Sequence, residues 1–218
     1  IRADFIKNEY FSMSVDAIGL SENLLKAVKE CGYKQLTPIQ QRAIPMIRSG
    51  VDILASAQTG TGKTAAFSLP IIDEVAKQAA GVPKALILTP TRELAIQVAE
   101  NVKQYSQYMA LKTAVVYGGV NMAGQGNSLK ASPDIIVATP GRLLEHMVLR
   151  NVDLSHIKHV VLDEADRMLD MGFMTDINRI FSHIQQKHQT LMFSATFSNK
   201  VKSLANEILN TPKTIEVA

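Results

Sequence analysis

The sequence predicts an α/β fold in which helices cover both faces of a mostly parallel, twisted sheet. Short apolar segments alternate with segments of helical period along most of the chain. The apolar segments are nearly continuous, as expected for strands that are buried on both faces of a parallel sheet. Polar or acidic residues directly follow several of these segments, and the carboxyl ends of strands are where such sheets bind ligands.

Composition limits the class of protein. The 218 residues suit one large domain with a sizeable core. Cys31 is the only cysteine, so no internal disulfide is possible, which agrees with a reducing, cytoplasmic location. The formal net charge of +3 permits nucleic acid as a partner without arguing for it. No apolar run reaches the roughly 18 residues of a membrane span, so we expect no membrane partner.

The first residues differ from the rest of the chain. Residues 1–12 show no clean period, and we expect them to be a leader that is partly foreign to the natural protein. An ordinary N-terminal extension is the alternative. Residues 13–218 then form the folded domain, and no low-complexity linker divides it.

Two helices are expected before the first strand. Ser21 is suited to cap the first helix, and Gly32 can close it in a left-handed conformation. Thr37 and Pro38 open the second helix, because proline is tolerated in a first turn. Pro45 lies further in and can bend this helix.

After these helices, strands and helices alternate. The strands are expected at residues 52–56, 84–89, 112–117, 134–138, 159–163, 189–193 and 214–217. The helices are expected from residue 65 to about 80, at 91–108, from 141 to about 149, within 164–170 and 176–185, and at 199–209. Two glycines break the chain after the third strand, and the segment from there to residue 133 is assigned no element.

A glycine-rich segment joins the first strand to the next helix. Residues 57–64 read Ala-Gln-Thr-Gly-Thr-Gly-Lys-Thr, which predicts a phosphate-binding loop in this strand-to-helix context. Its glycines let successive N–H groups point into one concavity at a helix N-terminus. Lys63 would reach the outer phosphates, and the Thr64 hydroxyl would ligate Mg²⁺. Ala57 departs from the commoner glycine, and a polar surface turn is the alternative.

Acidic residues follow the fifth strand. Residues 163–166 read Asp-Glu-Ala-Asp. Asp163 would hold Mg²⁺, partly through water, and Glu164 could orient or deprotonate an attacking water. Residues 194–196, Ser-Ala-Thr, end the next strand, and their hydroxyls could bond the Asp166 carboxylate. Ordinary turn chemistry is the alternative for these hydroxyls.

Several separate motifs, in the same order, resemble the first RecA-like domain of the DEAD-box ATP-dependent RNA helicases. They are Ala57 to Thr64, Pro90-Thr91-Arg92-Glu93-Leu94, Gly118-Gly119, Thr139-Pro140-Gly141-Arg142, Asp163 to Asp166, and Ser194-Ala195-Thr196. The alanine at 57 is the family's own form of the loop. Gly32 and residues 37–40 are similar to the adenine-reading Q motif. Residues 167–173 and 193–198 look closest to the bacterial RhlE-like members.

The resemblance implies roles for these residues and two ligands, ATP with Mg²⁺ and RNA that is single-stranded or a duplex end. Catalysis would fall to Asp163, Glu164 and Lys63. The implied ATP-binding residues are Lys34, Gln40, Ala57, Gln58, Thr59, Gly60, Thr61, Gly62, Lys63 and Thr64. The implied RNA-binding residues are Pro90, Thr91, Arg92, Gly118, Gly119, Thr139, Pro140, Gly141 and Arg142. Asp166, Ser194 and Thr196 would couple ATP hydrolysis to strand separation.

Two departures from the family pattern stand out. Val15 occupies the position of an aromatic residue that stacks on adenine, and Phe11 lies four residues too early. Nothing matches the motifs of the family's second domain, including its arginines, so we expect slow hydrolysis and poor unwinding by this chain alone. The missing second domain would be a partner.

Other functions remain open at this level. An ATP-gated RNA clamp without useful turnover would use the same residues. A small-molecule kinase would share the phosphate loop but would not explain Gln40 or residues 139–142. A DNA helicase is a further alternative, because contacts to 2′-hydroxyls cannot be read from sequence.

Overall fold

Strands and helices alternate through residues 12–217, which are the residues that the computed structural model describes. Residues 1–11 of the expected leader, with Phe11, lie outside the described residues. The strands are β1 (Ile53–Ser56), β2 (Ala85–Leu88), β3 (Thr113–Val116), β4 (Ile135–Ala138), β5 (His159–Leu162), β6 (Gln189–Ser194) and β7 (Lys213–Glu216). The helices are the 3₁₀ helix η1 (Val15–Ile18), α1 (Glu22–Glu30), α2 (Pro38–Arg48), α3 (Lys63–Ala76), α4 (Arg92–Tyr105), α5 (Met122–Lys130), α6 (Pro140–Val148), α7 (Ala165–Asp170), α8 (Met174–Ser182) and α9 (Asn199–Ile208).

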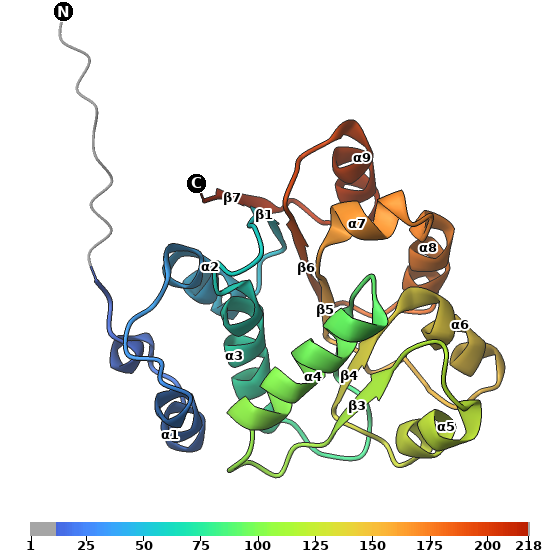
Figure 1. Cartoon of the computed structure of the whole chain (residues 1–218), viewed down its shortest axis with the longest axis horizontal. Helices are drawn as coiled ribbons and strands as arrows, with labels where there is room; N and C mark the ends of the chain where they lie inside the picture. Colours follow the sequence, from blue (N-terminus) through green and yellow to red (C-terminus); the bar gives the residue numbers. More distant parts are fainter. Residues whose placement is uncertain (1–11, 218) are drawn as a thin grey trace, which may run out of the picture.

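The seven strands form one sheet in the order β3-β4-β2-β5-β6-β1-β7, and every pair of neighbours is parallel. Parallel neighbours need crossover connections, which the helices supply (Figure 1). The α/β fold predicted from the apolar runs is therefore confirmed. All carboxyl ends of the strands meet at one edge of the sheet.

Each face of the sheet has its own apolar core. One core joins strand residues such as Ile87 and Phe193 to residues of α1–α4. The other joins residues of the opposite face, such as Leu88 and Met192, to residues of α5–α9. Every residue of β2 and β4 is buried, which is the physical reason for the continuous apolar sequence of these two strands.

The helix α5 corrects the sequence prediction, which assigned no element to this segment. Its buried residues are Gln125, Gly126 and Leu129, so no apolar stripe marks it. The remaining boundaries differ by a few residues at most from those expected. Among residues 12–217, no helix combines the length and the apolar character that crossing a bilayer requires.

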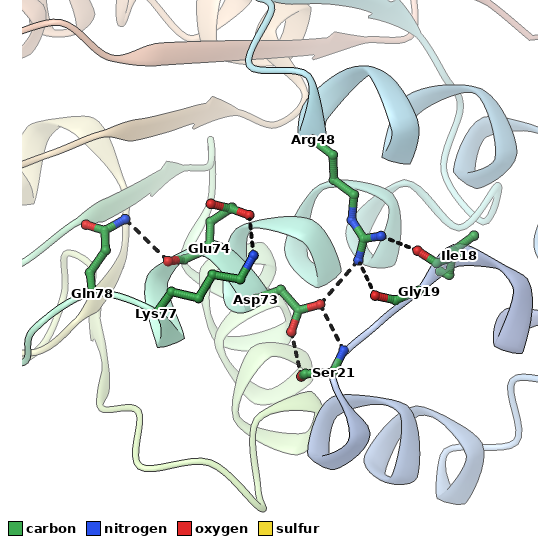
Figure 2. A network of polar contacts seen from close by, with 8 residues as sticks. All are labelled: Ile18, Gly19, Ser21, Arg48, Asp73, Glu74, Lys77 and Gln78. Carbon is green, nitrogen blue, oxygen red and sulfur yellow. Dashed lines mark hydrogen bonds and ion pairs between the residues drawn. The ribbon is translucent and has the colours of Figure 1, made fainter.

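A polar network fastens the N-terminal segment to α3, the helix that follows the phosphate loop (Figure 2). Asp73 on α3 accepts from the Ser21 hydroxyl at 2.6 Å and from the Ser21 backbone N–H at 3.2 Å. Arg48 of α2 pairs with Asp73 at 3.2 Å and donates to the carbonyls of Ile18 and Gly19. The segment that carries Val15 is thereby held against the helix of the loop.

Candidate nucleotide-binding site and RNA-facing edge

The predicted phosphate loop lies between β1 and α3 and requires glycine at two positions. Gly60 and Gly62 have φ values of +81° and +85°, which L residues rarely adopt. Gly62 also lies very close to the Q-motif segment. A Cβ on it would lie 2.5 Å from Gln40 Nε2 and 2.9 Å from Thr37 Oγ1. Only glycine lets the loop and α2 approach this closely.

The buried side chain of Gln40 contacts the backbone of the loop. Its side-chain oxygen accepts from the Thr37 N–H at 2.9 Å, and its Nε2 donates to the Gly62 carbonyl at 3.1 Å. The residue is 1% exposed. Each polar end of the amide therefore makes one hydrogen bond within the chain and keeps one further N–H or lone pair. The reading of adenine by Gln40 stays a prediction.

Lys63 contacts two acids at the end of β5. Its Nζ lies 3.0 Å from Asp163 Oδ1 and 3.5 Å from Glu164 Oε1. Asp163 is fully buried, and this burial raises the pKa of its carboxyl above the ordinary value, while the Lys63 ammonium opposes the rise. Glu164 has a φ of +53°, which turns the chain from β5 into α7. The tight turn brings both acids to the lysine of the loop.

The Asp163 carboxylate is suited to hold a cation. Its Oδ2 is buried and has no hydrogen-bond partner in the described part of the chain. An unpartnered carboxylate oxygen costs free energy unless a charge or a donor reaches it. Carboxylate and hydroxyl oxygens are ligands that Mg²⁺ prefers, and Thr64 lines the hollow next to the same lysine. The residues present therefore fit Mg²⁺.

Two hollows meet at Lys63 and Glu164. One, of about 270 Å³, is lined by residues 59–60 and 62–65 and by α4 residues that include Gln97 and Asn101. The other, of about 280 Å³, is lined by Ala57, Asp166, Arg167 and Ala195, among others. Both open at the carboxyl edge of the sheet, where a phosphate chain could lie along the loop.

Ser194, the last residue of β6, and Thr196, two residues later, behave differently from each other. The Thr196 hydroxyl donates to Asp166 Oδ2 at 3.4 Å, as the sequence suggested. The Ser194 hydroxyl does not reach Asp166. It donates to the Thr196 carbonyl at 2.8 Å because Ser194 is the buried last residue of the strand and closes the following turn.

The residues expected to bind RNA gather after β2, β3 and β4, which are neighbours in the sheet. Thr91 caps α4 by accepting from the Leu94 N–H at 3.2 Å, and Arg92 is exposed with its guanidinium 5.1 Å from the Tyr117 ring centre. Gly118 and Gly119 are also exposed. The predicted set thus shares one edge of the molecule.

Four of these residues lie deeper than a direct contact would suggest. Pro90, Thr139 and Pro140 are buried, and the side chain of Arg142 is 11% exposed. Arg142 Nη1 donates to the Val120 carbonyl at 2.9 Å. Arg142 therefore makes a hydrogen bond inside the chain, and its contact with RNA stays a prediction. Gly141 is half-buried.

Val15, at the position where the family pattern has an aromatic residue, lies beside a hollow. Val15 is buried in η1 and lines a hollow of about 330 Å³ together with Tyr33 and Lys34. Lys34 is exposed there. Tyr33, for which no role was predicted, also lines the hollow next to the phosphate loop. It supplies an aromatic ring near the position where Val15 has none.

The fold and the site together define a P-loop nucleotide-binding domain. A glycine-rich loop precedes a helix on a parallel sheet, and the acids of a neighbouring strand end contact its lysine. Comparison with known families gives the class more closely. A family model described as DEAD/DEAH box helicase matches residues 37–204, and the chain belongs to this family.

Named relatives agree with this assignment. The ATP-dependent RNA helicase CshA of Limosilactobacillus reuteri is 46% identical over 205 residues, which cover 94% of this chain and 41% of the relative. The DEAD-box ATP-dependent RNA helicase RhpA of Helicobacter pylori is 44% identical over 209 residues, covering 96% and 42%. This chain therefore spans about two fifths of the length of these relatives. Closeness to the RhlE-like members stays a prediction.

Solved structures agree as well. A DEAD box protein from Methanococcus jannaschii matches with a TM-score of 0.89 at 38% identity. The match covers 94% of this chain and 56% of the Methanococcus jannaschii chain. A hypothetical ATP-dependent RNA helicase from Sulfolobus tokodaii has a TM-score of 0.84 at 37% identity, covering 91% and 57%. The family assignment decides against a small-molecule kinase.

Proposed function

We propose that residues 13–218 are the first RecA-like domain of an ATP-dependent RNA helicase. In this proposal the domain binds ATP with Mg²⁺ and single-stranded RNA, and a second RecA-like domain completes both sites. The names of the relatives and their greater length support it. A cytoplasmic location belongs to the same proposal.

The observation that carries the proposal is the contact of Lys63 with Asp163 and Glu164. Lys63 would neutralise the outer phosphates, and the backbone N–H groups of residues 58–64 would cradle them. Thr64 and Asp163 would hold Mg²⁺, partly through water, and the bound ion would supply further neutralisation of phosphate charge. Glu164 would orient and deprotonate the attacking water.

RNA would lie along the edge formed after β2, β3 and β4. The exposed groups there are the Arg92 guanidinium and the backbone of residues 118–119. Such groups suit phosphates and riboses, so the binding would be largely independent of base sequence. Asp166, joined to Thr196 across the strand ends, and Ser194 would transmit the state of the nucleotide site to the second domain.

A calorimetric titration with Mg²⁺-ADP, Mg²⁺-ATP and Mg²⁺-GTP tests the nucleotide assignment. We expect binding of the adenine nucleotides and at least about tenfold weaker binding of GTP, a difference of about 1.4 kcal/mol. Gln40→Ala should lose the adenine preference and weaken binding, because it also removes the support of Gly62. Gln41→Ala, on the same helix and bonded to Leu36 instead, is the control. Equal binding of ATP and GTP that ignores Gln40 would refute the adenine assignment.

A further inference from the structure

Side chains from two helices hold the exposed two-glycine turn at residues 118–119 from both sides. Gln125 Nε2, on α5, donates to the Tyr117 carbonyl at 2.9 Å. Arg142 Nη1, on α6, donates to the Val120 carbonyl at 2.9 Å. These two carbonyls directly flank the glycines. The shape of the turn is therefore fixed at each end by a side chain that lies beneath it.

The two side chains are also bonded to each other and to a buried histidine. Gln125 Oε1 accepts from Arg142 Nη1 at 3.3 Å and lies 3.3 Å from His146 Nε2. His146 Nδ1 lies 3.0 Å from Asn151 Nδ2. His146 is 0% exposed and Gln125 is 9% exposed. The turn thus stands on a polar network inside the protein.

One neutral tautomer of His146 satisfies every bond in this network. Gln125 directs its NH₂ group to Tyr117, so its oxygen faces the imidazole. The oxygen can only accept, and Nε2 of His146 must carry the proton. Nδ1 is then free to accept from the Asn151 amide. The histidine acts as a relay of hydrogen bonds between α5, α6 and the loop after α6.

We propose, resting on the RNA binding proposed above, that Gln125 and His146 are positioning residues that hold the 118–119 turn ready for the RNA backbone. They lie beneath the turn and touch no RNA themselves. Gly119 has a φ of +83°, a left-handed conformation. Two adjacent glycines would readily leave such a conformation if nothing held them. A turn that is ordered before binding loses less conformational entropy when RNA arrives.

The test compares three substitutions in this chain. Gln125→Leu and His146→Leu keep the bulk and remove the hydrogen bonds, whereas His146→Gln supplies a donor and an acceptor again. Asn127→Ala, an exposed position on the same helix, is the control. Binding of a fluorescein-labelled oligouridylate is measured by anisotropy, Mg²⁺-ADP binding by calorimetry, and the order parameters of Gly118 and Gly119 by nitrogen-15 NMR relaxation.

We expect the two leucine variants to bind the oligouridylate about tenfold more weakly. Their order parameters at the two glycines should fall from about 0.85 toward about 0.6, while Mg²⁺-ADP affinity stays unchanged. His146→Gln should recover most of the RNA affinity, and Asn127→Ala should match the unmodified chain.

Two results would overturn the inference. One is unchanged RNA affinity and glycine order in Gln125→Leu. The other is a parallel loss of RNA and Mg²⁺-ADP binding, which would mean that the network only keeps the domain folded. Failure of the unmodified chain to bind the oligouridylate would instead defeat the proposed RNA-binding function. The order parameters would still decide whether Gln125 and His146 hold the turn.

Discussion

At the scale of single residues, close packing and backbone conformation both require glycine at position 62. Its φ of +85° disfavours any side chain, and a Cβ would also collide with Gln40. We predict that Gly62→Ala weakens Mg²⁺-ADP binding by at least about tenfold in calorimetry, because the left-handed conformation alone costs about 1–2 kcal/mol.

A second glycine separates the two causes. Gly50 has a similar φ of +86°, but a Cβ there would meet nothing within 4 Å. Gly50→Ala should lower thermal stability slightly and leave nucleotide affinity intact. If both variants bound Mg²⁺-ADP equally well, the contact between the loop and Gln40 would have no role in binding.

His146 makes stability depend on pH. Burial, and secondly the charge of Arg142, lower the pKa of its imidazole below the ordinary value of 6.5. The folded state therefore holds the neutral form, and the unfolded state takes up a proton first as the pH falls. The stabilisation is complete above pH 6.5 and is lost as the pH falls from there toward the lowered pKa.

Urea unfolding of the unmodified chain and of His146→Gln at pH 7.5, 6.5 and 5.5 measures this contribution. We expect the free energy of unfolding to fall less steeply below pH 6.5 in the variant. His159, whose pKa burial also lowers, remains as a common background in both proteins. An identical dependence of the unfolding free energy on pH in the two proteins would show that His146 titrates alike in the folded and unfolded states.

At the scale of elements, the alternation of strands and helices could be predicted because burial on both faces leaves a direct mark on sequence. β2 and β4 are apolar along their whole length. The helix α5 leaves no such mark. Gly126 lies in it because a Cβ there would come 2.9 Å from the Asn151 amide, and Gln125 is buried for its hydrogen bonds. Tertiary contacts, rather than an amphipathic pattern, decide this helix.

The attachment of the N-terminal segment to α3 gives a prediction at this scale (Figure 2). Asp73→Ala removes the partner of Arg48 and of both Ser21 donors. Because the carboxylate is buried and the bonds are charge-assisted, we expect a loss of about 2–4 kcal/mol in the free energy of unfolding, measured with urea.

A neighbouring residue on the same helix is the matched control. Glu74 pairs with Lys77, whose side chain is 70% exposed. Glu74→Ala should change the free energy of unfolding by no more than about 0.5 kcal/mol. Equal effects of Asp73→Ala and Glu74→Ala would mean that the network does not fasten the N-terminal segment.

At the scale of the whole molecule, the proposed second domain leads to a prediction about turnover. The chain spans 41% of the relative that it matches at 46% identity. We predict that it binds Mg²⁺-ATP but releases phosphate at least about 10³-fold more slowly than the full-length protein with RNA, because an arginine finger contributes about that much in related NTPases. Phosphate release by both proteins, with and without RNA, measures this.

Glu164→Gln in the full-length protein is the control, since it should abolish release in either case. RNA-stimulated release would support the helicase over an ATP-gated clamp. Rapid release by the isolated chain would contradict the need for a second domain.

Across the molecule, the residues of the site were predictable where a motif has a fixed local geometry. The loop with Lys63, and the acids Asp163 and Glu164, are brought together as the sequence suggested. The sequence could not predict which groups a polar side chain hydrogen-bonds. Gln40 and Arg142 turn inward, and only tertiary structure decides this.

The contact of Lys63 with two carboxylates has a consequence for how the site is filled. Its ammonium serves as the counter-ion of Asp163 and Glu164. Phosphates compete for the same ammonium, so nucleotide binding is an exchange of counter-ions rather than a simple addition. A carboxylate that gives up its lysine inside the protein needs another positive charge. The phosphates are expected to replace the carboxylates as partners of Lys63, and the divalent cation to replace Lys63 as the partner of the carboxylates. Each ligand should therefore raise the affinity of the other.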